Sequence, residues 1–302
     1  MKKKFIAKKK QKKSYKFLFF FIILIVVLTN IYKIIENSNY KLTNKDLIKI
    51  ILYNTNHHHK KYSITKNISK IKLTSIISNN YKKLVIKKTK NNTYKANNPI
   101  IYLYNTHQTE EYAPSNYVEY SIKPTVQMVN YIMEDYFNKK NFKTLVEERK
   151  IKDILISNKW NYAYSYKASR IFLEDVITKN KELKYFIDIH RDSLSKEKTT
   201  ITINNIKYAR IIFIIGLENN NYQENLEFTT KINNLLDKYY PNLSKGIYKK
   251  GGEGVNGVYN QDFNKNTILV EIGGKDNNID EVLNTTLAFS KCFVEVITNN
   301  ES

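Results

Sequence analysis

Two isolated histidines and a nearby glutamate have the residue types and the spacing of a hydrolytic metal site. His107 and Glu110 form an H-x-x-E pair, and this spacing in a turn or helix start lets both side chains reach one ion. His190 is the second isolated histidine, because the other three are adjacent at positions 57–59. Two imidazoles and one carboxylate would leave the fourth position of a tetrahedral zinc ion open to water, as in catalytic zinc sites.

Glu271 is the candidate general base of such a site. A zinc ion would lower the pKa of its bound water and polarise a scissile carbonyl. Glu271 would take the proton and pass it to the leaving nitrogen. Glu111 and Glu119 compete with Glu110 as the carboxylate ligand, since the spacing excludes neither of them.

Three charged residues next to His190 are candidates for supporting roles. Asp188 precedes His190 by two positions, so both side chains lie on one side of a strand, where Asp188 would orient the metal ligand. A solvent-facing or helix-capping aspartate is the alternative. Arg191 and Asp192 would pair with each other or contact substrate carboxylates. Arginine suits bidentate carboxylate recognition, and only four of the 50 basic residues are arginine.

Alternating apolar segments predict the elements that position these residues. The predicted strands are Ile100–Tyr104, Tyr185–Ile189, Ile206–Ile215 and Thr267–Ile272, and the predicted helices are Val126–Phe137, Trp160–Asp175, Leu226–Tyr240 and Asp280–Val296. The alternation indicates an α/β fold, a mostly parallel twisted sheet with helices on both faces. Catalytic and ligand-binding groups of such sheets lie at the carboxyl ends of the strands. His107, His190 and Glu271 are each at or beside such an end, which supports their assignment to one site.

Glycine and cysteine usage adds two constraints. All eight glycines follow residue 215, and seven of them fall between Gly246 and Gly274, which indicates backbone with positive φ or close approach to a ligand. Cys292 is the single cysteine, so an intramolecular disulfide and a Cys-rich zinc motif are both excluded. The three histidines at 57–59 fall in a weakly patterned stretch and are interpreted as an exposed loop tip.

The amino-terminal segment predicts a membrane anchor. Residues 1–16 form a basic tail with nine lysines, and 17–36 form an apolar stretch close to the length of a transmembrane helix. The lysine excess predicts a cytoplasmic amino terminus and export of the remainder. A cleavable signal peptide is the alternative, but no A-x-A-like cleavage site follows the apolar run. Residues 37–97 read as a stalk and 98–298 as the catalytic domain.

The formal net charge of +22 has two readings. It favours an anionic partner such as nucleic acid, lipid headgroups or an acidic polymer. Alternatively it records a composition rich in Lys, Asn, Ile and Tyr, the residues of A/T-rich codons. The predicted export of the domain argues against nucleic acid as the partner.

Six ordered blocks resemble the stage II sporulation protein P family of cell-wall amidases. They are IYLYNTHQTEEY (101–112), SYKASRIFLE (165–174), FIDIHRDS (186–193), IIFIIGLENNNYQENLEF (211–228), YPNLSKGI (240–247) and YNQDFNKNTILVEIGG (259–274). The resemblance covers about residues 98–298 and implies the α/β fold shared by zinc amidases and zinc carboxypeptidases. By position, it implies that His107, Glu110 and His190 hold Zn²⁺ and that Glu271 is catalytic. Asn260, in the last block, joins Asp188, Arg191 and Asp192 as a residue that contacts substrate or supports the ligands.

The resemblance also implies a function and partners. Family members are associated with N-acetylmuramoyl-L-alanine amidase activity, which cleaves the amide between the glycan's lactyl group and the stem peptide, and with endopeptidase activity on cross-links. The expected partners are peptidoglycan, the membrane, a glycan-cleaving wall hydrolase and a membrane scaffold protein. The alternative function is a membrane-anchored, non-catalytic scaffold that binds peptidoglycan. A full set of His107, Glu110, His190 and Glu271 argues against the scaffold.

Overall fold

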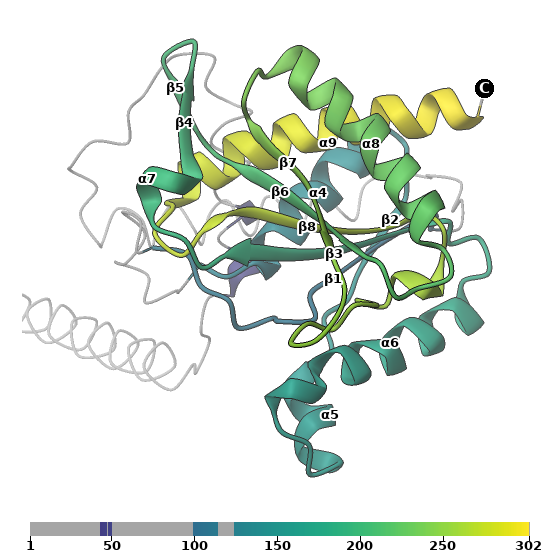
Figure 1. The fold of residues 1–302 in the computed structure, drawn as a ribbon. Helices are drawn as coiled ribbons and strands as arrows, with labels where there is room; N and C mark the ends of the chain where they lie inside the picture. Colours follow the sequence, from purple (N-terminus) through teal and green to yellow (C-terminus); the bar gives the residue numbers. More distant parts are fainter. Residues whose placement is uncertain (1–42, 47, 50–98, 114–123, 302) are drawn as a thin grey trace, which may run out of the picture. The chain divides into compact units, whose positions relative to one another are not determined.

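The computed structural model describes residues 43–46, 48–49, 99–113 and 124–301 (Figure 1). Among these residues, no helix combines the length and the apolarity needed to cross a membrane. The predicted anchor at 17–36 and most of the predicted stalk lie outside them, as do the histidines at 57–59.

A six-stranded sheet forms the centre of the described domain, in the order β2-β1-β3-β8-β6-β7. Its strands are β1 (Ile101–Tyr104), β2 (Thr144–Val146), β3 (Tyr185–Asp192), β6 (Ile211–Gly216), β7 (Ser244–Lys250) and β8 (Thr267–Gly274). Four of the five strand pairings are parallel and the β6–β8 pairing is antiparallel, so β6 and β7 run opposite to the other four strands. The prediction of a mostly parallel α/β sheet is confirmed.

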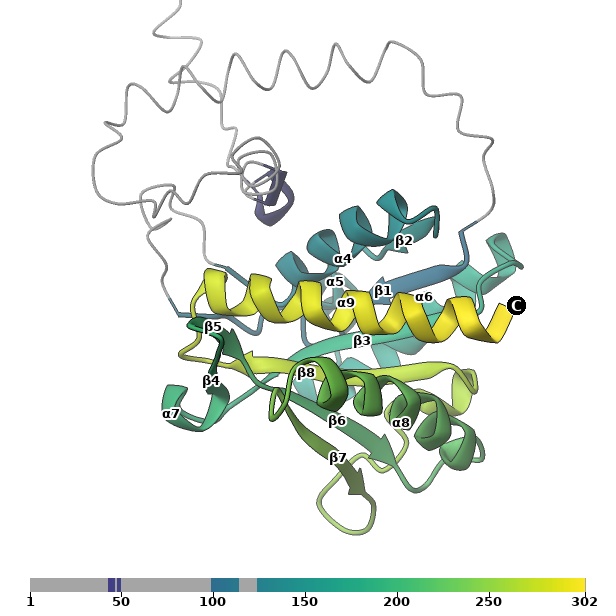
Figure 2. The same ribbon diagram turned by 90° about the horizontal axis from the view of Figure 1, so that it is seen from above.

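Helices cover both faces of this sheet (Figures 1 and 2). One face carries α4 (Gln127–Lys139), α8 (Tyr222–Tyr239) and α9 (Ile279–Glu301), and the other carries α5 (Ile151–Ser157) and α6 (Ser165–Lys179). All four predicted helices exist, with α6 starting five residues later than predicted. The short helices α7 (Lys196–Thr199), η2 (Tyr162–Tyr164) and η3 (Gln261–Phe263) lie in the connections.

The face under α4, α8 and α9 is an apolar core with aromatic contacts between layers. The ring of Phe293 lies 5.2 Å from that of Phe137, and the ring of Phe289 lies 6.2 Å from that of Phe213 in β6. All four of these rings are fully buried. Burying one such side chain stabilises a fold by roughly 1.5–3 kcal/mol, so this face anchors the sheet.

The α6 face changes character along each strand. Near the start of β1 and β3, Tyr102 and Phe186 pack against Leu173 of α6 in an apolar cluster. Further along β3, the same face carries Asp188 and then His190, which are both buried. Polar groups therefore replace the core where the strands approach their carboxyl ends.

The predicted strand Ile206–Ile215 is wrong as a single element. It divides at Arg210 into β5 (Ile206–Ala209), which pairs with β4 (Thr200–Ile203) in a separate two-stranded sheet, and β6 of the main sheet. Asn204 and Asn205 adopt positive φ angles of 49° and 62°, so they form the tight turn that returns β4 into β5. The Asn-Asn pair was the sequence signal for this hairpin.

Gly273 combines a positive φ with a close approach of neighbouring atoms, the two features expected of the glycine-rich region. Its φ is +68°, and an added Cβ would lie 2.8 Å from the Cβ of Ala209 and 2.8 Å from Oδ1 of Asn277. No side chain fits there without displacing its neighbours. The glycine therefore lets the end of β8 lie against β5 and the turn before α9.

We expect Gly273→Ala to destabilise the domain more than Gly252→Ala does. Gly252 has a similarly positive φ of +89°, yet an added Cβ there meets nothing within 4 Å. The control should lose about 1–2 kcal/mol of unfolding free energy from backbone strain, and Gly273→Ala about 1–3 kcal/mol more from crowding. Urea unfolding followed by circular dichroism measures both. Equal losses would contradict the close packing at Gly273.

Candidate metal centre

Strand register brings the predicted catalytic groups to one face of the sheet. His190 of β3 pairs directly with Glu271 of β8, and Tyr104 of β1 pairs with Asp188. Residues paired in parallel strands point to the same side, and alternate residues share a face. Asp188, His190 and Glu271 therefore all lie on the α6 face.

The chain that leaves β1 is held by buried polar contacts. Asp188 is fully buried, and its carboxylate accepts hydrogen bonds from the backbone N–H of Thr106 at 2.9 Å and from the Thr106 hydroxyl at 2.7 Å. The side chain of Asn105 donates to the carbonyl of Ile189 at 2.7 Å. These contacts tie the first residues after β1 to β3 and direct His107 toward His190.

His107, Glu110 and His190 form one cluster. One possible ligand atom from each lies within 4.8 Å of the others. Nδ1 of His107 is 3.6 Å from Oε1 of Glu110, and Nδ1 of His190 is 3.7 Å from Oε2 of Glu110. Ligands of tetrahedral zinc, each about 2.0–2.1 Å from the ion, are separated by about 3.3–3.4 Å. The donor set and its spacing therefore fit a zinc ion.

The charges in this cluster stabilise an ionised carboxylate between two imidazoles. Burial acts to raise the pKa of Glu110, but interactions with His107 and His190 outweigh it and hold that pKa at about 2. For His190, burial acts to lower the pKa, and the carboxylates of Asp188 and Glu110 raise it to about 10. The site attracts positive charge, and a bound cation would take the place of a proton on His190.

Asp188 lies where a residue that orients His190 should be. Its Oδ1 is 3.0 Å from Nε2 of His190, although the two atoms lack the alignment of a hydrogen bond. This leaves Nδ1 of His190 facing Glu110. Since Asp188 is fully buried, it is neither solvent-facing nor exposed as a helix cap.

Arg191 and Asp192 are directed to different partners. The backbone N–H of Arg191 donates to Oε2 of Glu110 at 3.0 Å, and its guanidinium donates to the carbonyls of Glu111 and Asp192. The Asp192 carboxylate accepts from the backbone N–H of Leu194 at 3.0 Å and lies 3.8 Å from Nζ of Lys245. The expected side-chain pair between them is not formed, because each side chain has nearer partners.

Glu271 is half-buried beside the cluster. Burial, and then the negative charge of Asp192, raises the pKa of its carboxyl. A carboxylate with a raised pKa is a better proton acceptor, which suits the predicted role of general base.

Of the three remaining candidate residues, one holds an element beside the cluster and the other two are not part of the cluster that the structure describes. Asn260 donates to the carbonyl of Tyr166 at 3.0 Å and to Oγ of Ser169 at 2.9 Å, so it fastens the start of α6 beside the site. Glu111 is exposed and pairs with Thr125 in an isolated β-bridge, outside the cluster that Glu110 enters. Glu119 lies outside the described residues.

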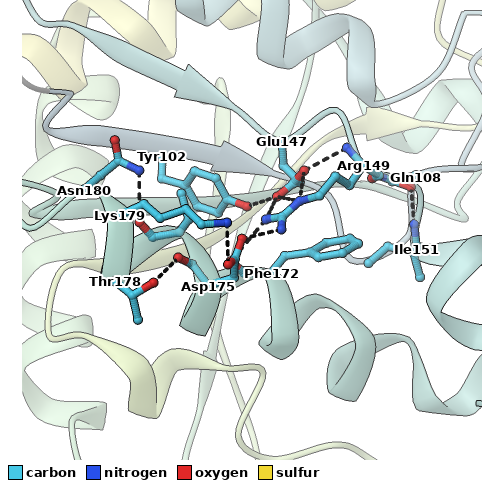
Figure 3. Close-up of polar contacts among 11 residues, drawn as sticks. Tyr102, Gln108, Glu147, Arg149, Ile151, Phe172, Asp175, Thr178, Lys179 and Asn180 are labelled. Carbon is cyan, nitrogen blue, oxygen red and sulfur yellow. Dashed lines mark hydrogen bonds and ion pairs between the residues drawn. The ribbon is translucent and has the colours of Figure 1, made fainter.

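Gln108 attaches the turn at residues 107–110 to the neighbouring elements, and this role was not predicted. The turn is called the metal loop because it carries two of the three candidate ligands. Its side chain donates to the carbonyl of Arg149 at 2.7 Å and accepts from the backbone N–H of Ile151 at 2.8 Å (Figure 3). Through these two hydrogen bonds, the Gln108 side-chain amide pairs with the backbone as a peptide group of a neighbouring strand would. Gln108 therefore fastens the turn between His107 and Glu110 to the start of α5. Its position inside the H-x-x-E pair was the one available signal.

Arg149 extends this attachment to α6 (Figure 3). Its guanidinium donates to both oxygens of the buried Glu147 at 2.9 and 3.0 Å and to Asp175 at 2.6 Å. The Tyr102 hydroxyl donates to Glu147 from β1, and the guanidinium lies 4.3 Å from the ring of Phe172. The metal loop, β1, α5 and α6 are thus joined through one ionic network.

Similarity to known proteins agrees with the motifs in the sequence. The family model described as Stage II sporulation protein P matches residues 20–294. The chain belongs to the stage II sporulation protein P family. Stage II sporulation protein P of Bacillus subtilis (strain 168) is 36% identical over 209 residues, which cover 67% of this chain and 52% of that relative. The chain therefore spans about half the length of this curated relative.

Two solved structures are more distantly similar to this family member. The CwlD amidase from Clostridioides difficile, in complex with the GerS lipoprotein, is 12% identical over 67% of this chain and 100% of that chain, with a TM-score of 0.45. Cwp6 from Clostridium difficile is 11% identical over 67% of this chain and 30% of that chain, with a TM-score of 0.42. Both scores lie below 0.5 and establish nothing about the chemistry of this chain.

We expect Gln108→Ala to weaken zinc binding by roughly 10–100-fold, because it releases the turn that carries two of the three ligands. Gln108→Glu keeps the acceptor for Ile151 but loses the donor to Arg149, so an intermediate loss is expected. The matched control is Gln223→Ala on the exposed start of α8. Competition against a chromophoric chelator measures the zinc affinity. Unchanged affinity in Gln108→Ala would show that the turn keeps its geometry without this attachment.

Proposed function

We propose that this member of the stage II sporulation protein P family is a zinc-dependent peptidoglycan hydrolase, an N-acetylmuramoyl-L-alanine amidase. The observation that carries the proposal is the cluster of His107, Glu110 and His190 beside Glu271, which is paired in register with His190. Family membership supports a role in sporulation and in the cell wall.

His107, Glu110 and His190 would hold the zinc ion, through Nδ1 of each imidazole and the carboxylate between them. When bound, zinc supplies a Lewis acid that polarises the substrate carbonyl and acidifies water. Asp188 keeps the His190 ring oriented, since it lies against the opposite nitrogen. Arg191 directs the Glu110 carboxylate through its backbone N–H.

Glu271 would act first as the general base and then as the general acid. Its carboxylate accepts a proton from the attacking water and returns it to the amide nitrogen as the bond breaks. The amine leaves as the free amino terminus of the stem peptide, and the lactyl group keeps a carboxylate. The raised pKa of Glu271, caused by burial and by Asp192, suits both transfers.

The wider setting of this activity is also proposed. Residues 17–36 would anchor the chain in the cell membrane, with a cytoplasmic amino terminus, and residues 98–298 would act outside the cytoplasm after the stalk at 37–97. Cleavage of cross-links would be a second activity. A glycan-cleaving hydrolase and a membrane scaffold protein are the expected partners. The net charge of +22 would keep the domain near anionic wall polymers and lipids.

We expect Glu271→Gln to lower the release of stem peptides from purified peptidoglycan by roughly 10²–10⁴-fold while zinc stays bound. His190→Ala should lose both the zinc and the activity, because it removes a ligand. Glu227→Gln, on the exposed side of α8, is the matched control. Mass spectrometry of digests by the full chain, together with metal analysis, gives both readouts. Loss of zinc in Glu271→Gln would make that residue a ligand and not the base.

Removing the metal tests the same proposal without mutation. We expect a chelator to stop the release of stem peptides by the full chain and stoichiometric zinc to restore it. Cut cross-links among the products would add the endopeptidase activity. Peptidoglycan that stays intact but is bound by the zinc-loaded protein would contradict the amidase and favour a scaffold.

A further inference from the structure

An exposed tyrosine forms a wall of the metal centre. Tyr162, in η2 between α5 and α6, stacks on His107 with ring centroids 4.9 Å apart and 26° between the planes. The side chain remains 53% exposed. One face of the Tyr162 ring therefore covers a metal ligand, while much of the residue is open to solvent beside the site.

A second pair of rings belongs to the same connection, with Trp160 and Tyr164 on either side of Tyr162 in the sequence. Tyr164 is 46% exposed and stacks on Trp160, with centroids 5.7 Å apart and 28° between the planes. Trp160 packs in turn against the apolar cluster between α5 and α6, and Nζ of Lys167 lies 4.4 Å from its ring. The exposed ring thus has a rigid support, and a ligand would not need to order it.

We propose that Trp160, Tyr162 and Tyr164 form an aromatic platform that binds the amino-sugar rings of the glycan strand next to the scissile amide. A pyranose ring presents a face of C–H bonds, which packs on the electron-rich face of an aromatic ring. Rigid aromatic side chains give such contacts at little cost in conformational entropy. The inference rests on the proposed function, because it takes the substrate to be peptidoglycan.

Position favours a sugar over the other ligand that such residues attract. Tryptophan and tyrosine with nearby lysines also occur at membrane interfaces. Here, however, Tyr162 contacts His107 of the candidate metal centre directly, and Trp160 and Tyr164 lie two residues from Tyr162 in the sequence. In the proposed substrate, one side of the scissile amide leads through the lactyl group to a sugar. A sugar must therefore lie within a few ångströms of the reacting carbonyl.

The platform can be tested by titration, because Trp160 is the single tryptophan of the chain. Full-length protein in detergent, with zinc, is titrated with the tetramer of N-acetylglucosamine, which has no amide bond to a peptide. We expect a saturable change in Trp160 emission. Tyr162→Ala and Tyr164→Ala should each weaken the apparent affinity roughly five- to tenfold. Ile206→Ala, with the same 46% exposure as Tyr164 but on the β4–β5 hairpin, should leave it unchanged.

Two results would overturn the proposal. One is the absence of a saturable response to the tetramer in the unmodified chain, and the other is unchanged affinity in both tyrosine variants. A blue shift with phosphatidylglycerol vesicles but no response to the tetramer would assign the rings to a lipid surface. The measurement is independent of turnover. Binding of the tetramer without release of stem peptides would refute the amidase alone, and the reverse would refute the platform alone.

Discussion

A carboxylate with no exposure to solvent constrains the whole site. Taking the charge of Asp188 out of water costs several kcal/mol unless hydrogen bonds compensate it. Those bonds come from Thr106, 82 residues away in the sequence, through its amide and its hydroxyl. The Asp188 carboxylate also faces His190. Satisfying this one group therefore sets where the chain leaves β1 and how the His190 ring is oriented. The distances from His107 and His190 to Glu110 depend on both.

The two faces of the sheet differ in the side chains that they bury. The face under α4, α8 and α9 is packed with apolar side chains, including the buried rings of Phe137, Phe289 and Phe293. On the other face, α6 covers the early parts of β1 and β3, and polar residues take over toward the carboxyl ends. The parallel pairing of β3 with β8 places Glu271 next to His190, and Gly273 lets the end of β8 pack closely against Ala209 and Asn277. The buried polar groups of the candidate site are thus confined to one face of the sheet, beyond the apolar cluster under α6.

The α5–α6 unit connects the metal loop to the surface around it. Gln108 attaches the loop to the start of α5, and Arg149 attaches the same region to Glu147 and to Asp175 of α6 (Figure 3). Between the two helices, Tyr162 stacks on His107. One structural unit therefore fixes the metal loop from outside and presents aromatic rings beside it. A group that bound substrate there would be positioned by the same network that holds the turn carrying His107.

The sequence by itself determined the main strands β1, β3 and β8, the four long helices and the two histidines of the candidate metal cluster. Their signals are local, because apolar periodicity defines each element and a polar residue after an apolar run marks a strand end. Tertiary structure alone decided that β6 and β7 run antiparallel to the other strands of the sheet, and that β2 and the lysine-rich β7 are strands of it. It also decided that Glu110 and not Glu111 is in the cluster, and that Gln108 and Tyr162 contact the residues around it. These outcomes depend on which residues far apart in the chain meet after folding, and the apolar period of one segment does not specify the partner of that segment.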